Sequence, residues 1–211
     1  MSFTGFAQKD FDTFHIEGLD SRMEAIRERI QPKFKELGDS LAADLSVLSG
    51  HDMHLHIAKH LRRKIHPPVD TWLAICHTKR GYKQVPHFQV GLFDDRLFIW
   101  LALIYELPSK QAIADAYAKN LKTIRKELPE SFLLSFDHMK KDTVAVKDMD
   151  KKAWIASLQR FRDVKKAELL IGLNLSANDA IVSDGDKLEQ LIKETFEKLL
   201  PLYKLAQKFA G

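Results

Sequence analysis

The sequence predicts an α+β fold, with one domain built on a central, mostly antiparallel sheet of about five or six strands and helices packed mainly on one face. Near both ends of the chain, apolar residues recur every three or four positions, which is typical of amphipathic helices. Residues 51–106 instead contain runs that alternate between apolar and polar side chains, which is typical of strands. Short connections separate these runs and favour antiparallel neighbours.

Length and composition agree with this fold class. The chain has 211 residues, 45% hydrophobic and 29% charged, which suits one globular domain over 1–211 and excludes disordered and collagen-like classes. A single cysteine, Cys76, excludes an internal disulfide. Residues 1–6 lack the pattern of a signal peptide, and the longest apolar run, Leu97–Tyr105, is far shorter than the about 20 residues of a membrane helix. We therefore expect a cytoplasmic protein with no membrane association.

The first predicted element is a long helical region over 20–49. Its apolar face repeats at spacings of three and four, and Ser21 followed by Glu24 has the spacing of a capping box. Pro32 and Gly38 predict a kink or a break near them. We expect the helical segment 1–50 to pack on a sheet formed mainly by 51–106 and 131–176.

Six segments follow as predicted strands. The run 97–105 is apolar on both faces, so we expect it to be central and covered. Pro67 and Pro68 predict an extended or turned connection, and Gly81 predicts a turn. The predicted strands cover residues 53–57, 71–77, 87–93, 97–105, 132–136 and 167–175.

Three further helices are predicted, over 109–128, over 151–161 and from the cap at Ser183 toward the C-terminus, with a kink at Pro201. The polar connection 138–150 is expected to be the most mobile one.

Positive charge is concentrated in one stretch. The net charge is +4, and residues 51–90 alone carry seven Lys or Arg against two acids, together with seven of the nine histidines. Such a concentration attracts phosphates, nucleic acid or acidic substrates. The alternative is a set of solvated charges at a sheet edge, which discourage aggregation.

Two basic segments, 59–64 and 79–83, are candidates for anion binding, because arginine offers a planar fork of donors that matches phosphate oxygens. If the first two strands pair antiparallel, the segments lie at opposite ends of a strand, roughly 20 Å apart. A longer connection would bring them together, and the sequence leaves both arrangements open. The candidate ligand-binding residues are Lys59, His60, Arg62, Arg63, Lys79, Arg80, Tyr82, Lys83, His87 and Gln89.

Proton transfer has its own candidates. His60 or His87 could act as general acid or base, since the ordinary pKa of histidine lies near neutrality. Asp70 and Glu106 are candidate assisting carboxylates, and the Asp137-His138 pair is another candidate at a sheet end. For each of them, a structural hydrogen bond is the commoner role.

Metal binding has weak candidates. His54 and His56 would share one strand face about 7 Å apart, which suits a transition metal. No Cys/His signature of fixed spacing accompanies them, so neither a metal nor a cofactor is predicted.

Several further motifs are spread over nearly the whole chain: 56–60, Arg63, Pro67-Pro68, Asp70-Thr71-Trp72, 79–83, Pro86-His87-Phe88-Gln89, 164–170 and Leu200-Pro201-Leu202-Tyr203. Together they resemble the YktB-like family of bacterial proteins. The resemblance implies a single-domain cytoplasmic α+β protein from a Gram-positive bacterium. That family is uncharacterised, so the resemblance assigns no catalytic residue.

The leading hypothesis is a binding module for a phosphate-bearing ligand, a nucleotide or nucleic acid, held by the basic patch in 59–83. One alternative is an enzyme that acts on a small phosphorylated or acidic substrate through His60 or His87. A further alternative is a module that binds a protein partner. A deep pocket would favour the enzyme. An open basic face would favour binding of nucleic acid, and an exposed apolar patch would favour a protein partner. The oligomeric state does not follow from the sequence.

Overall fold

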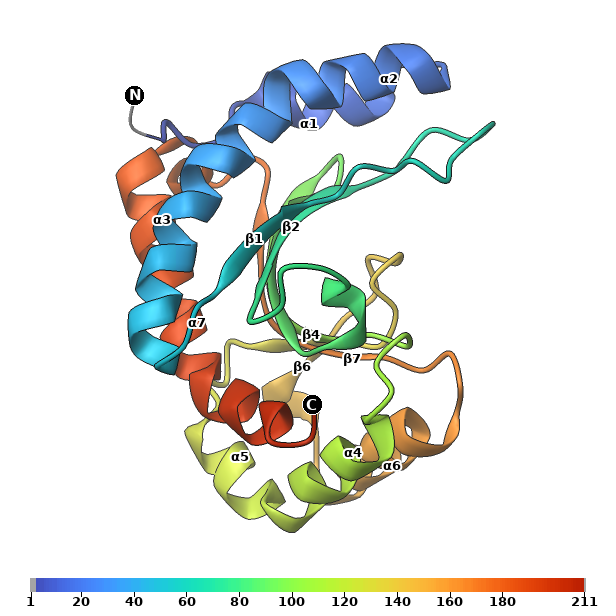
Figure 1. Cartoon of the computed structure of the whole chain (residues 1–211), viewed down its shortest axis with the longest axis vertical. Helices are drawn as coiled ribbons and strands as arrows, with labels where there is room; N and C mark the ends of the chain where they lie inside the picture. The colour runs from blue at the N-terminus through green and yellow to red at the C-terminus, as the bar shows by residue number, and fades with distance from the viewer. Residues whose placement is uncertain (1–2, 211) are drawn as a thin grey trace.

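The computed structural model describes residues 3–210, so residues 1, 2 and 211 of the predicted domain lie outside the described residues. Within that range the strands form one seven-stranded sheet in the order β1-β2-β3-β4-β7-β5-β6, and every neighbouring pair is antiparallel. The predicted α+β class and antiparallel sheet are confirmed (Figure 1). The strands are β1 His54–Ile57, β2 Thr71–Cys76, β3 His87–Leu92, β4 Arg96–Leu103, β5 Leu133–Ser135, β6 Val144–Ala145 and β7 Leu169–Ser176.

The six predicted strand segments correspond to β1–β5 and β7. The seventh strand, β6, has two residues and lies inside the connection that the sequence marks as polar and mobile. It pairs with β5, where Leu133 lies opposite Ala145. A strand of this length carries too little alternation to be recognised from sequence.

Helices account for most of the remaining chain. The predicted helix over 109–128 is divided between α4 and α5 at Asn120. Pro201 lies inside α7, whose last turns change direction (Figure 1). The helices are α1 Gln8–Phe11, α2 Leu19–Ala25, α3 Gln31–Ser49, α4 Lys110–Lys119, α5 Leu121–Glu127, α6 Lys151–Asp163 and α7 Gly185–Gln207.

The predicted break near Pro32 is a π-helical turn, η2 Ile26–Ile30, that joins α2 to α3. Proline has no backbone N–H to donate, so it disturbs the regular ladder in the turn before it. Gly38 does not interrupt α3, because it serves close packing. A Cβ on Gly38 would lie 2.4 Å from Cδ1 of Leu55, so α3 approaches β1 more closely than a larger side chain allows.

One face of the sheet carries the main core. Alternate residues of β2, β3 and β4, such as Leu73, Val90 and Ile99, are fully buried against the helices. α3 and α7 run side by side across this face, while α4 and α6 pack together near one end of the sheet (Figure 1). The apolar faces of these helices pack here on the apolar side chains of the strands. The prediction that helices cover mainly one face of the sheet is thereby confirmed.

The other face is covered by loops. Trp72, Phe98 and Trp100 form a second buried cluster there with Leu170, and Tyr82 packs against it. Tyr82 belongs to a short 3-10 turn, η3 Tyr82–Gln84, between β2 and β3. The connection 58–70 between β1 and β2, here called the arm, projects beyond the sheet (Figure 1). These loops are the elements that build the candidate site.

No helix among residues 3–210 is long and apolar enough to cross a membrane.

Candidate functional site

A pocket of about 330 Å³ opens on the loop-covered face, where the base of the arm, η3 and the loop after β5 meet. Its walls combine cations with aromatic rings. The lining residues are Ala58, Lys59, His60, Leu61, Arg62, Arg63, Trp72, Tyr82, Lys83, Glu106, His138 and Met139.

The two basic segments meet in part at this pocket. Lys83 comes from the second segment, yet it lines the same cavity as Arg62 and Arg63 from the first. β1 and β2 pair antiparallel, so the strand geometry alone would hold the segments apart. The connection after β2 instead folds back over the sheet, and the Trp72 indole N–H donates to the Tyr82 hydroxyl over 3.1 Å. This bond ties η3 to β2 and carries Lys83 toward the arm.

The other two cations of the second segment lie elsewhere. Lys79 lines a separate hollow with His54 and Lys59 near β1, and Arg80 is exposed and lines neither cavity. Four of the six predicted cations therefore converge.

His60 sits at the base of the arm in a left-handed backbone conformation, with φ of 50°. Its Nε2 lies 3.1 Å from the Thr71 hydroxyl, and its ring meets Trp72 edge-on. Burial, followed by the positive charges of Arg63 and Lys83, lowers the His60 pKa to about 4. His60 is therefore neutral at physiological pH.

Asp70 is 1% exposed, and neither carboxylate oxygen accepts a hydrogen bond from another described residue. Burial raises the pKa of Asp70 to about 6, although His138, Arg63 and Lys83 favour its charged form. Such an unpartnered buried acid is costly for stability, and strongly perturbed acids of this kind concentrate near functional sites.

His87 and Gln89 lie beneath the pocket and do not line it. The Nδ1–H of His87 donates to the Val85 carbonyl over 2.8 Å, and its Nε2 accepts from the Gln89 amide over 2.9 Å. Complete burial lowers the His87 pKa to about 3. Both ring nitrogens are thus occupied, and Tyr82 touches this ring edge-on at 5.2 Å.

Tyr82 and Glu106 complete the walls. Burial raises the pKa of Tyr82 to about 12, so its hydroxyl stays protonated and available as a donor. Glu106 follows β4 and lies 3.6 Å from the Lys83 ammonium. It is the single acidic side chain among the residues that line the pocket.

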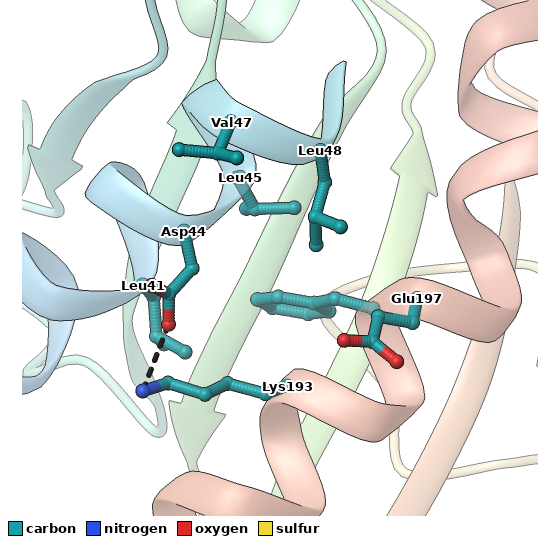
Figure 2. A pocket seen from close by; sticks show the side chains of 8 residues that line it. Leu41, Asp44, Leu45, Val47, Leu48, Lys193 and Glu197 are labelled. Carbon is teal, nitrogen blue, oxygen red and sulfur yellow. Dashed lines mark ion pairs between the residues drawn. The ribbon is translucent and has the colours of Figure 1, made fainter. Parts of the chain in front are cut away.

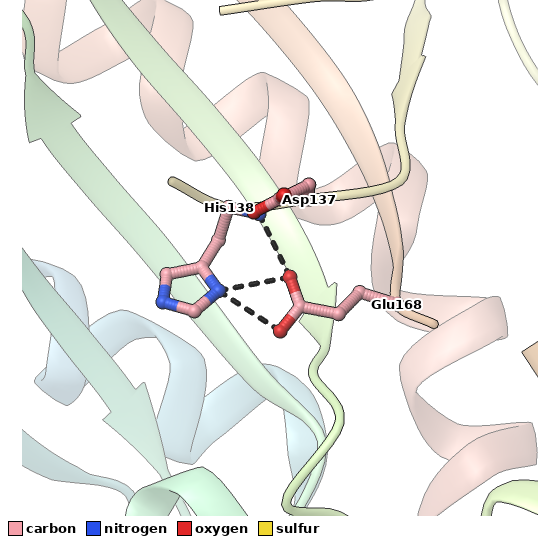
Figure 3. Close-up of side chains that lie close together, drawn as sticks. All are labelled: Asp137, His138 and Glu168. Atoms are coloured by element: carbon pink, nitrogen blue, oxygen red, sulfur yellow. Dashed lines mark hydrogen bonds and ion pairs between the residues drawn. The ribbon is translucent and has the colours of Figure 1, made fainter. Parts of the chain in front are cut away.

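The arrangement that sequence reasoning missed is the pairing of His138 with Glu168 (Figure 3). Nδ1 of His138 lies 2.8 Å from Oε2 of Glu168, which is buried just before β7. The sequence marks His138 only as a neighbour of Asp137. Nothing in sequence links it to Glu168, 30 residues away, because the contact depends on β5 pairing with β7.

Asp137, His138 and Glu168 are also the one group among residues 3–210 whose potential metal-ligand atoms all lie within 4.8 Å of one another. Both Glu168 oxygens already accept N–H groups, so hydrogen bonding accounts for the cluster without an ion. His54 and His56 are not part of it. The His56 Nε2 lies 2.8 Å from the Thr78 carbonyl, and Cys76 beside it is fully buried, which raises the thiol pKa.

Another hollow, of about 320 Å³, lies between α3 and α7 (Figure 2). Its walls are mainly apolar, including Leu45 and Phe196, and Lys193 pairs with Asp44 at 2.8 Å on its rim. It contains none of the predicted site residues.

Fold and site together define an α+β protein with a cation-lined pocket under the loops of one sheet face. The chain belongs to the family described as a domain of unknown function, DUF1054, whose pattern matches residues 6–203. A UPF0637 protein of Oceanobacillus iheyensis is 57% identical over 96% of both chains. UPF0637 proteins of Shouchella clausii and Exiguobacterium sibiricum are 50% and 51% identical over 96% and 99% of their lengths. These relatives confirm the resemblance to an uncharacterised family of Gram-positive bacteria.

Proposed function

We propose that the pocket at the base of the arm binds a small phosphate-bearing ligand. The observation that carries the proposal is the convergence of Lys83 with Arg62 and Arg63 on one cavity from separate segments. Solvated charges at a sheet edge, the alternative interpretation, would have no reason to share a concave surface.

Charge and size both support a small anion. Four cations line the pocket, Lys59, Arg62, Arg63 and Lys83, against one carboxylate, Glu106. Guanidinium groups donate in a fork that matches phosphate oxygens, and lysine adds a point charge. A volume of about 330 Å³ lies at the small end of the range for ligand pockets and favours a compact ligand over a nucleic-acid strand, which needs an extended groove.

Aromatic walls support a ligand that carries more than phosphate. Trp72 and Tyr82 line the cavity and are held together by their hydrogen bond. Lys83 Nζ lies 5.9 Å from the centroid of the Trp72 ring, so cation and ring share one wall. Such a pair suits a phosphate attached to a flat or apolar group.

The test is binding of inorganic phosphate, nucleoside monophosphates, sugar phosphates and short RNA to the full chain, by calorimetry at one salt concentration. The double variant Arg63→Ala, Lys83→Ala should bind at least tenfold more weakly, since hydrogen bonds to charged groups contribute about 1.5–3 kcal/mol each. The matched control is Arg80→Ala, which removes an exposed cation outside the pocket. Equal affinity in the double variant and the wild type would contradict the proposal.

A protein partner is the second candidate function, favoured by the arm. Leu61 and Ile65 are 84% and 77% exposed beside Arg62, Arg63 and Lys64. Exposed apolar side chains next to like charges suit an acidic protein surface. The variant Ile65→Ser would separate the two functions, because Ile65 does not line the pocket: it should weaken partner capture and leave phosphate affinity within about twofold.

A further inference from the structure

We propose that the same pocket hydrolyses small phosphate esters, with His138 as its general base and Glu168 as the residue that positions His138. The inference rests on the phosphate binding proposed above and adds a reaction to it.

Glu168 determines which nitrogen of His138 carries the proton. Its buried carboxylate accepts the backbone N–H of His138 over 2.7 Å and that of Tyr105 over 3.3 Å. It also lies 2.8 Å from Nδ1 of the His138 ring. A buried carboxylate that is held by two backbone donors is an acceptor, so Nδ1 must be the N–H that donates to it. The lone pair of the neutral ring is then on Nε2.

Nε2 is the atom left for chemistry. It lies on the side of the ring away from Glu168 (Figure 3). Among residues 3–210, none forms a hydrogen bond with it, and His138 itself lines the cation-rich cavity. The Trp72 ring meets the imidazole edge-on at 5.9 Å and limits its rotation. A base oriented by a carboxylate, with its second nitrogen without a protein partner at the wall of a ligand cavity, is the arrangement that general-base catalysis needs.

The two histidines predicted from sequence are less suited to the role. Both ring nitrogens of His87 are occupied beneath the pocket, and Nε2 of His60 lies within hydrogen-bond distance of Thr71. No buried carboxylate lies within hydrogen-bond distance of either ring among the described residues. The enzyme alternative therefore moves from His60 and His87 to His138.

The charged groups near His138 are divided by sign. Glu168 is buried against its Nδ1, Asp137 is next to it in sequence and partly exposed, and the buried Asp70 is close enough to interact electrostatically with it, as is His87. On the pocket side the cations Arg63 and Lys83 would hold the phosphoryl oxygens and offset the negative charge that grows on them.

The reaction needs no further reactant than water. The water oxygen attacks phosphorus while Nε2 of His138 takes a proton from that water. The bond between phosphorus and the ester oxygen breaks, and its electron pair leaves on the ester oxygen. The imidazolium then gives up this proton, which passes through solvent to the leaving oxygen and makes it an alcohol. Ester and water thus give alcohol and inorganic phosphate.

The experiment combines a structural and a kinetic measurement on the full chain. Nitrogen NMR of the protein labelled at histidine should show His138 protonated on Nδ1 and not on Nε2, with a ring shift change on addition of inorganic phosphate. Release of phosphate from para-nitrophenyl phosphate and a panel of sugar and nucleoside monophosphates should fall by about 10²–10⁴-fold in His138→Gln. Glu168→Gln should lower kcat with little change in KM and lose the single tautomer. The control His15→Gln changes an exposed histidine and should keep full activity.

The outcomes separate the two proposals. Phosphate binding without cleavage of any ester, or equal turnover in His138→Gln, would overturn the hydrolytic role and leave the binding role intact. A proton on Nε2 in the wild type would overturn the part assigned to Glu168, even if the variant Glu168→Gln fails to fold. Absence of phosphate binding, with the wild-type chain folded, would overturn the proposed function itself.

Discussion

Nδ1 of His138 lies 2.8 Å from Oε2 of Glu168, and this contact joins the loop after β5 to the residue that precedes β7. The carboxylate also accepts the backbone N–H of Tyr105, which follows β4. One buried side chain thus connects the ends of three neighbouring strands at the edge of the pocket. The same residue is therefore expected to matter for stability as well as for chemistry.

Replacement of Glu168 by alanine should lower the free energy of unfolding by about 3–5 kcal/mol, because it leaves two backbone N–H groups and a ring N–H without their acceptor. At about 2–4 °C per kcal/mol the melting temperature should fall by roughly 6–20 °C. Calorimetric and urea unfolding measure both quantities. The exposed Glu130→Ala is the control and should change stability by less than about 0.5 kcal/mol. A loss as small as the control's would mean that water replaces the carboxylate.

Asp70 should make the protein less stable as pH rises. Its folded pKa, raised from 3.8 to about 6 by burial, lies above the unfolded one. The stability that this group contributes is therefore complete below pH 3.8 and is lost as pH rises toward about 6 and beyond. At 1.36 kcal/mol per pKa unit the loss is roughly 3 kcal/mol. Asp70→Asn should stabilise the protein at pH 7 by up to this amount, measured by urea unfolding from pH 4 to 8.

The matched control for this prediction is Asp142→Asn, which neutralises an exposed carboxylate and should keep the wild-type pH profile. If Asp70→Asn is instead less stable than the wild type at pH 7, the ionised carboxylate must be held by groups such as Arg63 and His138 more strongly than burial penalises it.

His87 should make the protein less stable as pH falls, which is the opposite of the effect of Asp70. Burial lowers its folded pKa from 6.5 to about 3, so its contribution is complete above pH 6.5 and is lost as pH falls toward 3. The slope should approach 1.36 kcal/mol per pH unit between pH 6 and 4. NMR of the ring should show no titration above pH 4. Ring signals that move between pH 5 and 7 would show that the bonds to Val85 and Gln89 open in solution.

Periodicity was sufficient to predict the architecture. Val90 alternates with Gln89 and Gly91 in β3, which is the period-two pattern of a strand. Ile99 instead lies between Phe98 and Trp100, in a run that is apolar on both faces and is buried on both. Pro32 correctly marked the region where the long N-terminal helix changes its winding. Gly38 does not mark a change in the helix. A glycine is needed there because Leu55 of β1 approaches it closely, and no local sequence pattern connects Gly38 with β1.

The site was harder to predict for the same physical reason. The charge count found Arg62, Arg63 and Lys83, but only the fold of η3 over the sheet shows that they share a cavity and that Arg80 does not. Burial determines the protonation state of His87. The pairing of β5 with β7 brings Glu168 to His138. No regular spacing of residues in the sequence reveals long-range contacts of this kind.

Glu106 should weaken the binding of phosphate, and its neutralisation should tighten it. The Glu106 carboxylate lies 3.6 Å from the Lys83 ammonium and is the single acidic side chain among the pocket-lining residues. Both side chains are partly exposed, so their ion pair contributes at most about 1 kcal/mol. Glu106→Gln should therefore raise the affinity for inorganic phosphate by about two- to fivefold, measured by calorimetry at low salt. The gain should shrink in 0.5 M salt, because exposed charges are screened.

Glu197→Gln, in the hollow between α3 and α7, is the matched control and should leave the affinity unchanged. Weaker binding in Glu106→Gln would mean that the carboxylate accepts a hydrogen bond from the ligand or orients Lys83 toward it, and not that it competes with the anion.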